Sequence, residues 1–160
     1  MREQILEILR KDARTSSEMI ADLIGSDAET VAKEIAEMEE EGVIRRYKTI
    51  IDREKAGDER VFAFIDVRVS PTRGVGFDDV ARRIYRYPEV HSVYLVSGDY
   101  DLRVVVEGET MKEVAFFVAD KLSTLDGVLS TQSNFLLKKY KEDGDIFDDI
   151  EEDTGRLLIS

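Results

Sequence analysis

Residues 90–107 read V-H-S-V-Y-L-V-S-G-D-Y-D-L-R-V-V-V-E, and this stretch decides the fold of the second half of the chain. Two alternating runs rich in β-branched residues flank a five-residue interruption, Ser97–Asp101. Gly98 beside Asp99 tolerates the positive φ and tight reversal of a short loop, so the stretch predicts a β-hairpin. Such a turn also offers backbone N–H groups and hydroxyls to a ligand. The hairpin is therefore the predicted centre of a small-molecule-sensing domain.

Patterns on both sides of the hairpin complete an α+β domain. Before it, residues 61–69 alternate as a strand and residues 77–84 repeat apolar side chains at helical spacing. After it, a capping box at Thr110–Glu113 opens a helix, and residues 128–140 form a last strand. The order strand, helix, strand, strand, helix, strand predicts a ferredoxin-like fold. Two helices cover one face of such a sheet, so we expect its apolar other face to pack against a second copy in a dimer.

Three helices are predicted at the amino-terminal end. The first spans about residues 2–11, and capping boxes at Thr15–Glu18 and Ser26–Glu29 open the second and the third. Gly25 and Gly42 end these two helices. The tight turn between them predicts a helix-turn-helix. A three-helix bundle that only mediates association is the alternative.

A basic, β-prone run at residues 43–51 follows the third helix. It predicts a wing that touches DNA phosphate, and the alternative is a solvated edge strand protected by its charge. The third helix carries mostly acidic outward residues, and only Lys33 is of a type common in base-edge contacts. Either Thr30 and Lys33 read the DNA while the acids point away, or the DNA affinity is weak. The predicted DNA-binding residues are Thr15, Ser16, Ser26, Thr30, Lys33, Arg45, Arg46 and Lys48.

Composition limits the class of protein. The 160 residues are 42% hydrophobic, enough for a packed core, and the absence of cysteine excludes disulfides and thiolate metal sites. There is no apolar signal region and no run of about 20 apolar residues, so a cytoplasmic location without membrane contact is expected. The net charge of −12 opposes non-specific nucleic-acid binding.

Four segments are expected along the chain. Residues 1–52 form a winged helix-turn-helix domain, 53–60 a polar linker, and 61–140 the sensing and oligomerisation domain. Residues 141–160 form an acidic tail with two cations against eight anions. Apolar residues within this tail favour docking as an extra strand on a neighbouring sheet edge, and a disordered solvating arm is the alternative.

The chain resembles the Lrp/AsnC transcriptional regulators of bacteria and archaea over about residues 1–140. The matching residues near the amino terminus are Asp12-Ala13-Arg14, Glu39, Gly42-Val43-Ile44 and Tyr47. Those in the second half are Pro88-Glu89-Val90, Val93, Tyr94, Val96–Asp101, Gly127-Val128, Thr131 and Ser133. The combination P-E-V…G-D-Y-D behind a helix-turn-helix is fairly specific, whereas G-D-Y-D alone would not be.

The resemblance implies a regulator of amino-acid metabolism that binds an operator in double-stranded DNA. It implies dimers that pair through their sheets, often assembled into octamers, and an amino-acid effector between sensing domains with no other cofactor. Glycine-turn N–H groups suit a carboxylate, and Asp99 or Asp101 suits an ammonium, unless these carboxylates cap the turn instead. The expected effector-binding residues are Ser97, Gly98, Asp99, Tyr100, Asp101, Thr131 and Ser133.

Two other functions stay open at this point. One is an effector-binding or assembly protein whose acidic head no longer recognises DNA. The other is an enzyme, because sirohaem decarboxylases resemble this family in architecture and a single histidine can hold a haem. His91 is the only histidine, and no cluster of His and Arg for a tetrapyrrole's carboxylates is evident. We therefore expect neither an enzyme nor a metal site.

Overall fold

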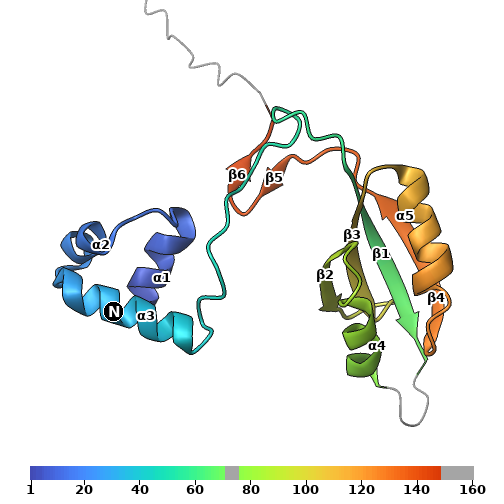
Figure 1. Ribbon diagram of the computed structural model, residues 1–160, viewed down its shortest axis with the longest axis horizontal. Coiled ribbons are helices and arrows are strands. Elements are labelled where there is room, and N and C mark those ends of the chain that lie inside the picture. The colour runs from blue at the N-terminus through green and yellow to red at the C-terminus, as the bar shows by residue number, and fades with distance from the viewer. Residues whose placement is uncertain (71–75, 149–160) are drawn as a thin grey trace, which may run out of the picture. The chain divides into compact units, whose positions relative to one another are not determined.

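The computed structural model describes residues 1–70 and 76–148. The chain divides between Ile51 and Asp52 into two compact units (Figure 1). Each unit has its own apolar core. No helix within the described ranges is long and apolar enough to cross a membrane.

The amino-terminal unit consists of three helices around a small core. They are α1 (Arg2–Lys11), α2 (Ser17–Ile24) and α3 (Ala28–Glu40), as the sequence predicts. Apolar residues recur at helical spacing, so each helix turns one apolar stripe inward. The side chains that this packing buries are Ile5, Ile20, Ala21, Val31 and Met38.

Helices α2 and α3 begin one residue later than predicted. Ser16 rather than Thr15 is the N-cap of α2, and its hydroxyl accepts an N–H bond from the first turn. Asp27 rather than Ser26 caps α3, where its carboxylate accepts the N–H of Thr30. An ionised carboxylate also interacts favourably with the positive end of the helix dipole, which favours Asp27 at this position.

The predicted strand at residues 43–51 is wrong. This segment runs as irregular chain, and no described residue pairs with it in a ladder (Figure 1). A β-prone run forms a strand only where a second strand can satisfy its backbone groups. Two side chains tie its first half to the helices: Ile44 packs on the core, and Tyr47 Oη donates a 2.7 Å hydrogen bond to Glu39.

The second unit is a four-stranded antiparallel sheet with two helical segments on one face. The strands are β1 (Val61–Val69), β2 (Val90–Leu95), β3 (Leu102–Gly108) and β4 (Val128–Phe135), in the order β2-β3-β1-β4. The helices are α4 (Phe77–Ile84) and α5 (Met111–Phe117), which continues into the π-helical segment η1 (Val118–Leu122). This element order is the predicted ferredoxin-like one.

The core of this unit lies between the sheet and its helices. Alternate residues of the inner strands point to it, because side chains along a strand alternate between the two faces. The buried residues are Ala63, Ile65, Val67 and Val69 from β1, Leu102, Val104 and Val106 from β3, and Val80, Ile84, Val114, Phe117, Val118 and Leu122 from the helical layer.

The opposite face of the sheet, called here the outer face, mixes apolar and charged side chains. Phe62 and Phe64 are half-buried on it. Asp66 is only 7% exposed, and Arg103 donates to its two carboxylate oxygens at 2.8 and 3.2 Å. Asn134 Nδ2 lies 3.4 Å from one of these oxygens. The prediction that this face is apolar is therefore confirmed only in part, because the Asp66–Arg103 ion pair lies on its two inner strands.

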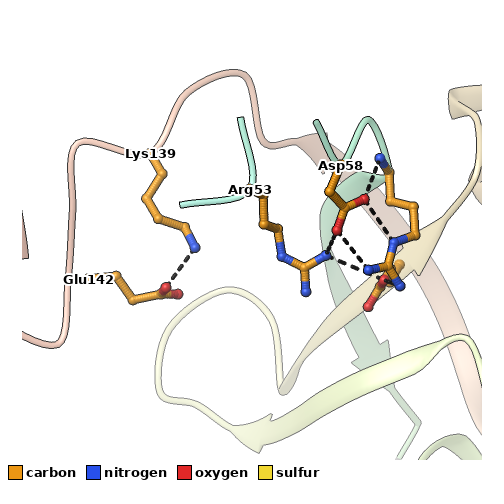
Figure 2. Close-up of polar contacts among 6 residues, drawn as sticks. Arg53, Asp58, Lys139 and Glu142 are labelled. Carbon is orange, nitrogen blue, oxygen red and sulfur yellow. Dashed lines mark hydrogen bonds and ion pairs between the residues drawn. The ribbon is translucent and has the colours of Figure 1, made fainter. Parts of the chain in front are cut away.

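Residues 53–60, predicted as a linker, are tied to the sheet by charged contacts that we call the linker clamp (Figure 2). Asp58 accepts hydrogen bonds from Arg53 at 2.7 Å and from Arg60 at 2.9 and 2.7 Å. Glu107, near the end of β3, forms ion pairs with both arginines. These bonds, chiefly those from Arg60, hold the pKa of Asp58 below its usual range. The clamp makes this segment part of the second unit.

The last strand, β4, ends before its predicted limit at Tyr140. Beyond it, β5 (Lys141–Glu142) and β6 (Asp145–Ile146) pair with each other, and no other strand of the described ranges, including the edge strands of the sheet, pairs with them (Figure 1). Asp143 and Gly144 join them with positive φ values of 49° and 99°, as in a tight hairpin turn. The rest of the predicted tail strand, and most of the loop predicted before α4, fall outside the described residues.

Gly108 provides a test of how closely α5 packs on the sheet. A Cβ on Gly108 would lie 2.9 Å from Cγ2 of Val114, which is fully buried and restricted in χ1. Gly108→Ala is expected to lower the free energy of unfolding by about 1–3 kcal/mol, as overpacking does, measured by chemical denaturation. The control is Gly76→Ser, which adds a side chain in open space at the N-cap of α4. Equal stability of the two variants would contradict this packing.

Candidate DNA-binding and effector sites

A tight turn joins α2 to α3 in the candidate DNA-binding unit. Gly25 has a φ of +72°, and its N–H bonds to the carbonyl oxygen of Ala21. Glycine adopts this left-handed conformation without steric cost. The carboxylate of Asp27 then accepts both the N–H and the hydroxyl of Thr30, at 2.8 and 2.7 Å. In a helix-turn-helix the first residues of the second helix face the bases, so Asp27 orients the Thr30 hydroxyl at that end.

The predicted DNA-binding residues fall into two groups. Three hydroxyl-bearing residues take part in local capping: Thr15 Oγ1 donates to the carbonyl of Asp12, Ser16 caps α2, and Thr30 donates to Asp27. Ser26 is half-buried in the turn. The predicted cations are all exposed: Lys33, Arg45, Arg46 and Lys48. Lys33 also forms a 4.0 Å ion pair with Glu37, one turn further along α3.

The acidic residues of α3 are partly neutralised from within the unit. Arg2 on α1 donates three hydrogen bonds to carboxylates of α3 and its C-cap, at 2.6 Å to Glu34, 2.8 Å to Glu37 and 2.7 Å to Glu41. The hydrogen bond that Arg2 donates to Glu41, followed by the one it donates to Glu34, raises the pKa of Arg2 above its usual value. This group of three carboxylates therefore points toward α1, and Arg2 offsets part of its charge.

The candidate effector site is the loop Ser97–Asp101 between β2 and β3. Gly98 has a φ of +120°, as the hairpin signal predicts. Within the described ranges, the N–H groups of Ser97, Gly98 and Asp99 donate no hydrogen bond. Asp101 is occupied, because its carboxylate accepts the N–H of Val69 at 2.7 Å. Of the two loop carboxylates, Asp101 therefore fixes the loop to the end of β1.

The other loop carboxylate is available. Asp99 is exposed, and its side chain has no hydrogen-bond or ion-pair partner in the part of the chain that the structure describes. Its backbone carbonyl, in contrast, accepts two hydrogen bonds from Arg68, at 3.1 Å from Nε and 2.8 Å from Nη2. Tyr100 Oη donates to Gln132 Oε1 at 2.9 Å. The loop thus has one carboxylate, that of Asp99, without a described partner. Its backbone is hydrogen-bonded to Arg68 of β1, and the Tyr100 side chain is hydrogen-bonded to Gln132 of β4.

Thr131 and Ser133 do not join this loop within one chain. In the sheet register they pair with Val67 and Ile65, whose side chains face the helices. Thr131 Oγ1 lies 3.3 Å from Ser123 Oγ in the helical layer. The predicted effector residues therefore separate into the loop itself and a second pair on the helix-covered side of β4.

Sequence reasoning missed Arg68 and Gln132. The alternation of the first strand places Arg68 on the face opposite the core, which was available from the sequence. Its contact with the loop depends on β1 lying beside β3, a pairing between segments about thirty residues apart. His91 is also exposed, with Nδ1 3.0 Å from Ser92 Oγ and its ring edge-on to Phe62. Among residues 1–70 and 76–148, no three His, Asp or Glu side chains are grouped to hold a metal ion.

Arg2 offers a test of the electrostatics of α3. Arg2→Ala would leave Glu34, Glu37 and Glu41 without their shared cation, so the affinity for DNA should fall by about three- to tenfold. The loss should shrink as salt is raised, because salt screens these charges. Fluorescence anisotropy with a labelled duplex measures the affinity. Arg10→Ala, which removes a cation of α1 whose one ion-pair partner among the described residues is Glu7, is the control. An equal effect of both variants would rule out a specific role for Arg2.

Comparison with known proteins covers both units. A family model described as the Lrp/AsnC ligand binding domain matches residues 62–146, and one described as a winged helix-turn-helix DNA-binding domain matches residues 1–45. The chain is 52% identical to the HTH-type transcriptional regulator YugG of Bacillus subtilis, over 98% of this chain and 95% of that protein.

Solved structures share the fold. The leucine response regulatory protein LrpA of Mycobacterium tuberculosis superposes with a TM-score of 0.75 at 22% identity, over 90% of this chain and 95% of that one. A transcriptional regulator of Neisseria meningitidis, solved as a complex with L-Met, gives 0.71 at 24% identity, over 88% and 90%. These relatives are transcriptional regulators and not enzymes. With both units matched in order, the chain belongs to the Lrp/AsnC family and is a transcriptional regulator with a helix-turn-helix and a ligand-binding domain.

Proposed function

We propose that this protein regulates genes of amino-acid metabolism and that a small amino acid, bound near Ser97–Asp101 between two subunits, controls its binding to DNA. The observation that carries the proposal is the free carboxylate of Asp99 beside unpaired N–H groups of a glycine turn. No other cofactor is needed for this role.

The chemistry of the loop suits both ends of an α-amino acid. Backbone N–H groups around Gly98 can donate to an α-carboxylate, as turn amides do at many anion sites. The Asp99 carboxylate can accept from the α-ammonium, and a charge-assisted hydrogen bond is stronger than a neutral one. Asp101 is not assigned this role, because its carboxylate already binds the N–H of Val69. The complex of the Neisseria regulator with L-Met supports an amino acid as the class of ligand.

A site shared between subunits accounts for the separation of the predicted residues. Thr131 and Ser133 lie on the helix-covered side of β4 and make no described hydrogen bond to the loop of their own chain. In a symmetric assembly they can approach the loop of a neighbouring copy. We propose a homodimer, with further assembly into an octamer, as the form that binds the effector.

DNA contact in this proposal rests on a few exposed cations. Thr30 and Lys33 lie near the start of α3, and Arg45, Arg46 and Lys48 follow it at positions that can reach phosphate. A two-fold symmetric protein favours a palindromic operator. The second candidate function, effector-driven assembly without DNA recognition, is favoured by the net charge of −12.

Gel-shift titration on DNA flanking the gene separates these two functions. Operator binding is expected to weaken steeply with salt, and Arg45→Ala should reduce the slope of log affinity against log salt by about one. Arg86→Ala in the second unit is the control, because Arg86 is exposed and has no ion pair among the described residues. Absence of binding at low salt, with each of the twenty amino acids present, would leave only the assembly function.

Calorimetric titration of the amino acids tests the effector site. At least one should bind, and Asp99→Asn should weaken that binding by about tenfold or more, because the amide removes the charge that the ammonium requires. Asp126→Asn, also exposed and without a described partner, should bind as the unaltered protein does. If no amino acid binds, or if Asp99→Asn binds equally well, this site is not the effector site.

A further inference from the structure

We propose that Arg68 is a positioning residue for the effector loop, which rests on the proposed function of that loop as an amino-acid site. Arg68 is the last outer-face residue of β1 and projects from the strand that pairs directly with β3. It makes no ion pair with any described residue, and its hydrogen bonds within the described ranges all go to the loop.

The geometry holds one peptide unit of the loop. Two nitrogens of the guanidinium group, Nε and Nη2, donate to the same carbonyl oxygen of Asp99, at 3.1 and 2.8 Å. The guanidinium fork is planar and rigid, so two bonds from it restrict the orientation of the carbonyl more than a single bond would. Because the Asp99 side chain leaves the same residue, fixing this carbonyl also limits the directions that its free carboxylate can take.

The same side chain contacts the next residue of the loop. The guanidinium carbon lies 5.3 Å from the centre of the Tyr100 ring, within the range of a cation–π contact. Tyr100 is held at its other end, where Oη donates to Gln132 on β4 at 2.9 Å. Arg68 therefore contacts two adjacent residues of the loop, through the carbonyl oxygen of Asp99 and the ring of Tyr100.

The remaining loop contacts do not replace this one. Val96 N–H bonds to the carbonyl of Asp101 at 2.9 Å, and Asp101 N–H bonds to the carbonyl of Val67 at 3.0 Å. Both bonds close the base of the loop, whereas no described backbone bond holds Gly98 or Asp99. The tip of the loop, which carries the free carboxylate and the free N–H groups, is held by the side chain of Arg68. Holding the tip before the effector arrives lowers the ordering cost of binding.

Three variants of the full chain test this role. Arg68→Ala removes the support, Arg68→Lys keeps the charge but has a single donor group in place of the fork, and Arg83→Ala removes an exposed arginine of α4 that has no ion pair within the described ranges. Backbone ¹⁵N relaxation of residues 97–99, measured by NMR without effector, gives order parameters that report how well the loop tip is held. The order parameters should fall in Arg68→Ala, be partly restored in Arg68→Lys and stay unchanged in Arg83→Ala.

Binding to L-methionine and to L-methioninamide, measured by calorimetry, completes the test. A positioning role predicts that Arg68→Ala weakens both ligands by a similar factor of about ten, because the loop and not the carboxylate contact is lost. A loss confined to L-methionine would make Arg68 a direct carboxylate ligand and overturn the proposal, as would unchanged order parameters at residues 97–99 in Arg68→Ala. If the unaltered protein binds neither these ligands nor any other amino acid, the proposed effector function fails, and the relaxation measurement alone decides whether Arg68 holds the loop.

Discussion

Strand β1 contributes side chains to both faces of the sheet, and its last residues also bind the loop of the neighbouring hairpin. As an inner strand between β3 and β4, it can do so only because successive side chains alternate between faces. One set fills the core, while the other carries Phe62, Phe64, Asp66 and Arg68 across the outer face. Its last residues then bind the Ser97–Asp101 loop through the N–H of Val69 and the guanidinium group of Arg68. The core, the outer face and the candidate effector loop therefore all depend on the register in which β1 pairs with β3 and β4.

Charge in this molecule is arranged in small groups in which one cation contacts several carboxylates, or the reverse. Arg2 serves three glutamates of α3 and its C-cap, and Asp58 serves two arginines of the linker clamp. Exposed ion pairs contribute little to stability singly, so their value lies in what they orient. In the first unit Arg2 draws three acids of α3 and its C-cap toward α1, and one of them, Glu37, also pairs with Lys33 at 4.0 Å. In the second unit the ion pairs attach the chain that leads into β1. Part of the acidity of the first unit is therefore neutralised locally.

Local patterns predicted the helices, the succession of strands and helices along residues 61–135, and the Gly98 turn, because each is set by neighbouring residues. Three expectations depended on distant partners and were altered by them. The run at residues 43–51 has strand propensity but no strand beside it, and β4 stops at Phe135 where its pairing with β1 ends. Asp101 was expected to bind an effector or cap its own turn, yet its carboxylate binds Val69 across the sheet. Arg68 could not be assigned to the loop from the sequence, because its contact depends on β1 lying beside β3. What a residue contacts over long range follows from topology, which a single sequence reveals only indirectly.

The division of the chain between Ile51 and Asp52 also sets how firmly each part is folded. The first unit has five buried core side chains, whereas the second has thirteen in its cluster. A domain of about 60 residues buries only about 60% of the surface that its unfolded chain exposes, so the smaller unit is the marginal one. DNA binds only its folded form, and occupancy therefore stabilises it by mass action, by about 2.7 kcal/mol when free DNA stands at 100 times its dissociation constant. The helix-turn-helix unit is thus more resistant to heat and proteolysis when DNA is bound to it than when it is free.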